Sequence, residues 1–67
     1  MKSVIKILNM YSKEDSRKIN ETIGQNEGVI ASQISLKKKE VTIVYDELTI
    51  KVEKIVELIE DLGYMVN

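Results

Sequence analysis

The sequence contains no cysteine and no histidine, and it also lacks phenylalanine and tryptophan. Without cysteine no disulfide can form, so a chain of 67 residues must obtain its stability from efficient packing or from association. The absence of Phe and Trp leaves Ile, Val and Leu to fill the interior. Hydrophobic residues make up 43% of the chain, which is enough for one compact core and too much for a disordered tail. We therefore expect a single domain over residues 1–67.

The charge and hydropathy of the chain exclude several classes of partner. A formal net charge of -1 argues against a generic phosphate- or nucleic-acid-binding protein. No apolar run approaches the ~20 residues of a membrane span. The amino end also lacks the apolar core and small-residue cleavage pattern of a secretory signal. These features predict a cytoplasmic protein with no nucleic-acid partner and no membrane partner.

The first part of the chain predicts a strand followed by a helix. Residues 2–8 are rich in β-branched and apolar side chains, which is typical of a strand. Ser12 offers a helix cap, and Asp15 three residues later completes a looser form of the capping box. Ile19 and Ile23 follow at helical spacing and are the expected buried anchors of this helix.

The rest of the chain predicts two further strands, a second helix and a short last strand. A strand over 29–36 would place four residues on its inward face, namely Ile30, Ser32, Ile34 and Leu36. The next strand would turn inward Val41, Ile43 and Tyr45. Thr49 is the expected cap of the second helix, whose apolar stripe comprises Val52, Ile55, Ile59 and Leu62. Gly63 ends this helix, and residues 64–66 are expected to form the last strand.

This order of elements indicates the fold class. We predict an α+β, ferredoxin-like βαββαβ sandwich, in which a four-stranded antiparallel sheet of order 4-1-3-2 carries two helices on one face. Right-handed crossovers favour this arrangement over its alternatives. Because many functions share the architecture, individual residues must decide the function.

Four short motifs carry a resemblance to a known family. They are Asn9-Met10-Tyr11-Ser12-Lys13-Glu14-Asp15 after the first strand, Gly28-Val29 after the first helix, Tyr45-Asp46 after the third strand, and Leu62-Gly63-Tyr64 after the second helix. With them the chain resembles the heavy-metal-associated (HMA) domain, the fold of copper chaperones and of the amino-terminal modules of metal-pumping ATPases. The first motif reads Gly-Met-x-Cys-x-x-Cys in that family.

The resemblance implies a metal site whose ligands are absent here, because Ser12 and Asp15 occupy the positions of the two family cysteines. The family's cargo is Cu(I) or Zn(II), and soft cations select thiolate ligands rather than a hydroxyl or a carboxylate. We therefore expect no cofactor, a degenerate metal site, and a protein-interaction module of metal homeostasis. The alternative is weak or interface-assisted metal binding through the 9–15 loop, by Asp15, Glu14 and Ser12. Met10 matches a buried family residue and is expected in the core.

Chain direction in this fold brings three segments to one end, namely the 9–15 loop, the lysine turn formed by Lys37-Lys38-Lys39, and the Gly63-Tyr64 bend. Relatives use this end to dock partner domains through complementary charge. We therefore expect an acidic protein partner, with electrostatics setting the rate of encounter. The expected docking residues are Lys13, Lys37, Lys38, Lys39 and Tyr64. In the alternative interpretation, the lysine turn only keeps a hairpin soluble and blocks edge pairing.

Two other functions of this architecture lack the residues that they need. An acylphosphatase-like enzyme would require a phosphate cradle, and the chain has no Gly-rich loop, no His base and no Cys nucleophile. We therefore expect no enzymatic activity. An RNA-recognition module would stack bases on aromatic residues of the sheet. Tyr45 is the only mid-strand aromatic residue, and its position in the alternation points it inward.

Overall fold

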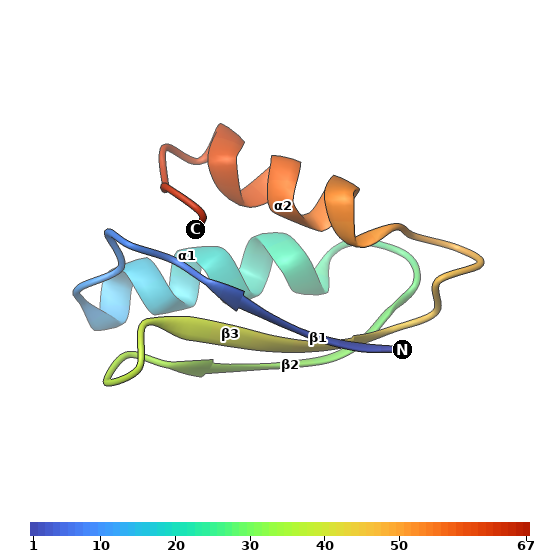
Figure 1. Cartoon of the computed structure of the whole chain (residues 1–67), viewed down its shortest axis with the longest axis horizontal. Coiled ribbons are helices and arrows are strands. Elements are labelled where there is room, and N and C mark those ends of the chain that lie inside the picture. The colour runs from blue at the N-terminus through green and yellow to red at the C-terminus, as the bar shows by residue number, and fades with distance from the viewer.

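The computed structural model describes residues 1–67 and arranges them in two layers, a sheet and a pair of helices (Figure 1). In chain order the elements are β1 (Lys2–Lys6), α1 (Lys13–Gly24), β2 (Val29–Ser35), β3 (Glu40–Tyr45) and α2 (Val52–Asp61). Both helices lie on the same side of the sheet, as Figure 1 shows, and the other face of the sheet is open. Neither helix combines the length and the apolar character that a bilayer crossing requires.

The sheet has three strands in the order β1-β3-β2, and both pairings are antiparallel. Lys2 pairs with Val44 at one end of the β1 ladder, and Ser35 pairs with Glu40 where β2 turns into β3. The central position of β3 explains its burial pattern, because alternate residues from Val41 onward are buried against the helices. The predicted inward face of this strand is confirmed.

The carboxyl-terminal segment does not form the fourth strand that the sequence predicts. It makes a single antiparallel bridge, between Val66 and Ile7, next to the end of β1. The Leu8 N–H donates to the carbonyl of Met65 at 2.8 Å, but the N–H of Met65 is taken by the Asn9 side chain at 2.7 Å. Because a side chain uses this donor, the ladder does not extend, and the expected order 4-1-3-2 is reduced to three strands with a bridge beyond β1.

A β-bulge at the start of β2 changes which residues face the core. Val29 pairs with Tyr45 and Ala31 pairs with Val44, so Ile30 has no partner across the ladder. The extra residue shifts the alternation, and Ile30 is 70% exposed. The prediction that Ile30 faces inward is therefore wrong, and Val29 packs against the core in its place.

The core contains twelve buried residues, of which eight are isoleucines. Ile19 and Ile23 anchor α1 as predicted, and Ile55 and Ile59 anchor α2. Each of these four side chains is completely inaccessible to solvent. Burying one such side chain stabilises the fold by about 1.5–3 kcal/mol. The aliphatic side chains thus supply the interior that a chain without Phe, Trp and disulfides needs.

The second helix begins at Val52, three residues after Thr49, which the sequence predicts as its cap. Its N-cap is Lys51, and no side chain caps the free N–H groups. The Thr49 hydroxyl instead donates to the Asp46 carboxylate at 3.1 Å, within the turn that connects β3 to α2. The cap prediction is wrong because the hydroxyl forms a local turn contact rather than a helix contact.

Gly28 lies close to Thr49 and Ile50 in the segment before α2, so a substitution there tests how tightly this region is packed. Its φ of 98° lies in the left-handed region, and a Cβ atom there would lie 2.9 Å from Ile50 Cγ2. We expect Gly28→Ala to lower the free energy of unfolding by about 2 kcal/mol or more, since strain and overlap add. Gly24→Ala is the matched control, because Gly24 ends α1 with open space around it. That change should stabilise by about 0.5 kcal/mol. Urea unfolding of both variants measures the difference, and equal midpoints would contradict the expectation.

Candidate functional site

The loop after β1 is fixed at one end of the molecule by the neighbouring lysine turn. The Ile7 N–H donates to the Lys39 carbonyl at 2.8 Å, and the Lys39 ammonium lies 4.2 Å from the centre of the Tyr11 ring. Lys39 adopts a φ of 54°, which is uncommon for a residue other than glycine. Its carbonyl and its ammonium group therefore both hold the turn against the loop.

The same loop is tied to the segment that follows α2. The side chain of Asn9 donates to the Gly63 carbonyl at 3.3 Å and accepts the N–H of Met65 at 2.7 Å. The loop therefore contacts both the lysine turn and the segment after α2, as the sequence predicts for this end of the molecule. Asn9 was not singled out by its sequence context, because both of its partners are more than fifty residues away.

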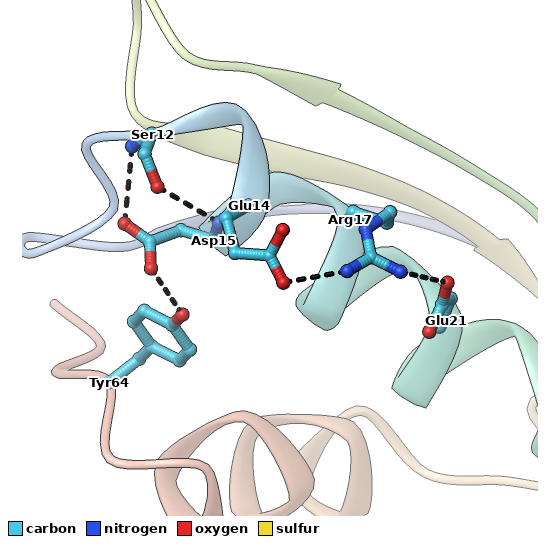
Figure 2. Close-up of polar contacts among 6 residues, drawn as sticks. All are labelled: Ser12, Glu14, Asp15, Arg17, Glu21 and Tyr64. Carbon is cyan, nitrogen blue, oxygen red and sulfur yellow. Dashed lines mark hydrogen bonds and ion pairs between the residues drawn. The ribbon is translucent and has the colours of Figure 1, made fainter.

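Ser12 and Asp15 form the capping box that the sequence predicts at the start of α1. Ser12 is the N-cap, with extended backbone angles, and its hydroxyl accepts the N–H of Asp15 at 3.1 Å. In return, Oδ2 of Asp15 accepts the N–H of Ser12 at 3.1 Å (Figure 2). The same oxygen also accepts the N–H of Tyr11 at 3.0 Å. The two residues at the cysteine positions therefore bond to each other and to the loop backbone.

The other carboxylate oxygen of Asp15 accepts a hydrogen bond from a distant residue. The Tyr64 hydroxyl, 49 residues further along the chain, donates to Oδ1 at 2.6 Å, and Figure 2 shows the ring approaching from the segment after α2. This bond, followed by those from Tyr11 and Ser12, lowers the pKa of Asp15 to about 2. Burial, followed by the Asp15 carboxylate, raises the pKa of Tyr64 to about 12. Both groups thus hold a fixed protonation state at neutral pH.

These contacts leave a poor set of ligands for a soft metal ion. Both oxygens of Asp15 are occupied, and the neutral hydroxyl of Ser12 is a weak ligand for Cu(I) or Zn(II). Met10 is completely buried, as predicted, so its thioether belongs to the core. No group of three His, Cys, Asp or Glu side chains lies close enough together to hold a metal ion.

Glu14 does not join Asp15 in a carboxylate cluster. Its carboxylate pairs with Arg17 at 2.6 Å, and the same guanidinium contacts Glu21 at 3.2 Å on the next turn (Figure 2). The guanidinium makes both contacts on the exposed side of α1. Glu14 and Asp15 therefore point in different directions in this structure (Figure 2).

The lysines predicted to dock a partner lie on the surface at this end. Lys13, Lys37 and Lys38 are exposed, and Lys39 is half-buried over Tyr11. None of them takes part in an ion pair, since both ion pairs of the chain use Arg17. Their positive charge is therefore not neutralised by a contact within the chain.

The aromatic residue available at this end is Tyr11, not Tyr64. Tyr64 is only 8% exposed, and its hydroxyl is occupied by Asp15, whereas Tyr11 is 69% exposed. Leu8 and Met65, which share a backbone hydrogen bond, are also exposed. A weak signal for Tyr11 is present in the sequence, because a residue between a buried methionine and a helix cap lies in a loop where side chains face water.

The hydrogen bond from Tyr64 to Asp15 predicts how the stability of the fold changes in acid. The unfolded chain binds a proton at Asp15 near the ordinary pKa of 3.8, and the folded chain does so only near 2. The stabilisation by Asp15 is therefore complete above pH 4 and is lost as the pH falls through about 2. In Tyr64→Phe the pKa of Asp15 should move back toward 3.8, and the loss of stability in acid should shrink.

Carboxyl-carbon NMR titration of both proteins measures this shift in pKa. Tyr45→Phe is the matched control, because the Tyr45 hydroxyl contacts Ser3 at 3.0 Å and not Asp15. An Asp15 pKa that stays near 2 without the Tyr64 hydroxyl would contradict the assignment.

Known proteins share the sequence pattern and the fold of this chain. The sequence matches the family described as "Heavy-metal-associated domain" over residues 4–65. The structure is similar to that of the CopZ metallochaperone, with a TM-score of 0.96, 21% identity and 100% of both chains covered. A search of curated protein sequences finds no match.

Two further structures share the fold. One is a copper binding domain from HMA7, a P-type ATPase, with a TM-score of 0.93 and 24% identity over 98% of this chain and 89% of that chain. The other is the yeast copper transporter domain CCC2A, with a TM-score of 0.92 and 26% identity over 98% of this chain and 90% of that chain. The family match spans nearly the whole sequence and includes the loop with Ser12 and Asp15. The chain therefore belongs to the heavy-metal-associated domain family, and it does so with neither of the cysteines that define the family's metal loop.

Proposed function

We propose that this chain is a protein-docking member of its family, which acts in metal homeostasis without itself carrying a soft metal ion. The observation that carries the proposal is the set of hydrogen bonds on Asp15. Its two carboxylate oxygens accept one hydroxyl and two backbone N–H groups, so the position of a metal ligand is used to close the loop. Binding of a cation there would have to break these charge-assisted bonds.

The docking surface in this proposal is the end of the molecule that the loop and the lysine turn share. Tyr11 supplies an exposed aromatic side chain to this end, and the Lys39 ammonium lies 4.2 Å from the centre of its ring. The lysines at the rim have no ionic partner within the chain, which favours an acidic protein surface as the partner. Charge of this kind raises the rate of encounter more than the final affinity.

The absence of a soft-metal site is tested by restoring the thiolates. We expect Ser12→Cys with Asp15→Cys to bind one Cu(I) at least about a thousandfold more tightly than the parent, because soft cations select thiolates. Competition with a chromogenic Cu(I) chelator measures the affinity of each protein. The matched control places two cysteines at the same spacing on the exposed side of α2, as Lys54→Cys with Glu57→Cys.

The parent chain should also give no response of the 9–15 amide signals to Cu(I), Zn(II) or Ca(II) in NMR titrations. Sub-micromolar binding of Cu(I) by the parent monomer would refute the proposal. A double-cysteine variant that folds and binds no better than the control would refute the alignment of the loop.

The docking role is tested by reversing the charge of the lysine turn. We expect Lys37→Glu, Lys38→Glu and Lys39→Glu together to slow association with a captured acidic partner by about tenfold or more at low salt. Three exposed lysines elsewhere provide a control with the same net charge, namely Lys2→Glu, Lys6→Glu and Lys54→Glu.

Affinity capture from the native cell supplies the partner, and stopped-flow mixing then measures the association rate for the parent and both variants. An equal rate for the parent and the lysine-turn variant at low salt would count against docking at this end.

A further inference from the structure

The two outer edges of the sheet are protected to very different degrees. β1 carries Lys2 and Lys6, and the bridge between Ile7 and Val66 covers the chain just beyond it. β2 is the other edge strand, and no element pairs with its outer side. Residues 28–36 contain no charged side chain and no proline. Native proteins ordinarily protect an exposed edge with such residues, so β2 is an unprotected edge.

The ladder with β1 determines which backbone groups of β3 face β2. Met1 and Tyr45 exchange both of their hydrogen bonds, each at 2.9 Å. In an antiparallel ladder, hydrogen-bonded pairs alternate with pairs whose N–H and C=O groups point away. Starting from Tyr45, alternate residues of β3 therefore bond to β1. The intervening residues, Val44, Thr42 and Glu40, bond to β2.

This alternation identifies the free groups of β2. Ala31, Gln33 and Ser35 pair with the residues of β3 that face them, so their N–H and C=O groups are used inside the sheet. The N–H and C=O groups of Ser32 and Ile34 therefore point to the open edge. Because the bulge disturbs only the start of the strand, residues 31–35 form a regular edge with two free donors and two free acceptors.

Charges of opposite sign flank this edge symmetrically. Glu27 lies two residues before β2, and Lys37 lies two residues after it, at the start of the lysine turn. Both side chains are exposed, and neither takes part in an ion pair within the chain. When two identical strands pair antiparallel about a twofold axis, the start of each lies beside the end of the other. Each Glu27 would then lie beside the lysine turn of the other copy.

We propose that β2 is a self-association edge, through which two copies of this chain pair antiparallel and join their sheets into one. The backbone groups of Ser32 and Ile34 supply the hydrogen bonds, and the two Glu27–lysine contacts set the direction of pairing. A net charge of only -1 on each copy opposes the approach very little. This self-complementary charge pattern favours a second copy over an unrelated extended peptide.

Sedimentation velocity of the full chain at increasing concentration tests the proposal. We expect a concentration-dependent dimer that weakens as salt is added, because its charged contacts are exposed. Amide hydrogen exchange should slow with concentration at Ser32 and Ile34. A chain that stays monomeric up to about 1 mM overturns the proposal, as does a dimer in which these two amides keep their monomer exchange rates.

Charge-swapped copies identify the contact. Glu27→Lys alone, and Lys37→Glu with Lys38→Glu and Lys39→Glu, should each weaken self-association about tenfold, since like charges then meet twice. An equimolar mixture of these two variants should recover a heterodimer, because both contacts become attractive again. Glu53→Lys on α2 is the control with the same change in charge as Glu27→Lys, and it should leave the dimer unchanged. If Glu27→Lys and Glu53→Lys weaken self-association equally, the proposed edge is wrong.

Discussion

The carboxylate of Asp15 joins the start of α1 to two other parts of the chain at one end of the molecule. It bonds to the loop through the N–H groups of Tyr11 and Ser12, and to the segment after α2 through the hydroxyl of Tyr64. A metal ion bound by two loop residues would also fix this loop, but only while it is present. Here the cross-link is part of the chain, and the low pKa of Asp15 keeps it charged throughout the neutral range. These bonds hold the loop in the structure without a bound metal ion.

A loop that is already ordered changes the energetics of docking. Binding to a flexible loop must supply the free energy that orders it, whereas a preformed surface avoids that cost. Met10 is completely buried and anchors the loop in the core. The side chain of Asn9 ties the loop to Gly63 and Met65 by hydrogen bonds. Met10 belongs to the same core cluster as the eight isoleucines, so the loop is anchored in the interior of the fold. Tyr11 is thus an exposed aromatic residue on a rigid base, which is the kind of side chain that dominates binding energy at interfaces.

Sequence patterns predicted the parts of this molecule that depend on local spacing. The capping box of Ser12 and Asp15 is such a case, since both residues belong to one helical turn. The exposure of Ile30 was not predictable, because it arises from a bulge in the pairing of two strands. The second function of Asp15 was also invisible, since Tyr64 lies 49 residues away and no periodicity connects them. Replacement of the cysteines could thus be seen in the sequence, but the hydrogen bonds that take their place could not.

The lysine turn connects the two interactions proposed for this chain. It borders the docking end through Lys39, which contacts Tyr11, and it follows directly on the open edge of β2. In a dimer paired through β2, Glu27 of the second copy would neutralise part of the positive charge that an acidic partner needs. The two equilibria are then coupled, and coupling of binding free energies is reciprocal. Self-association lowers the affinity for an acidic partner, so the same partner must shift the chain toward the monomer.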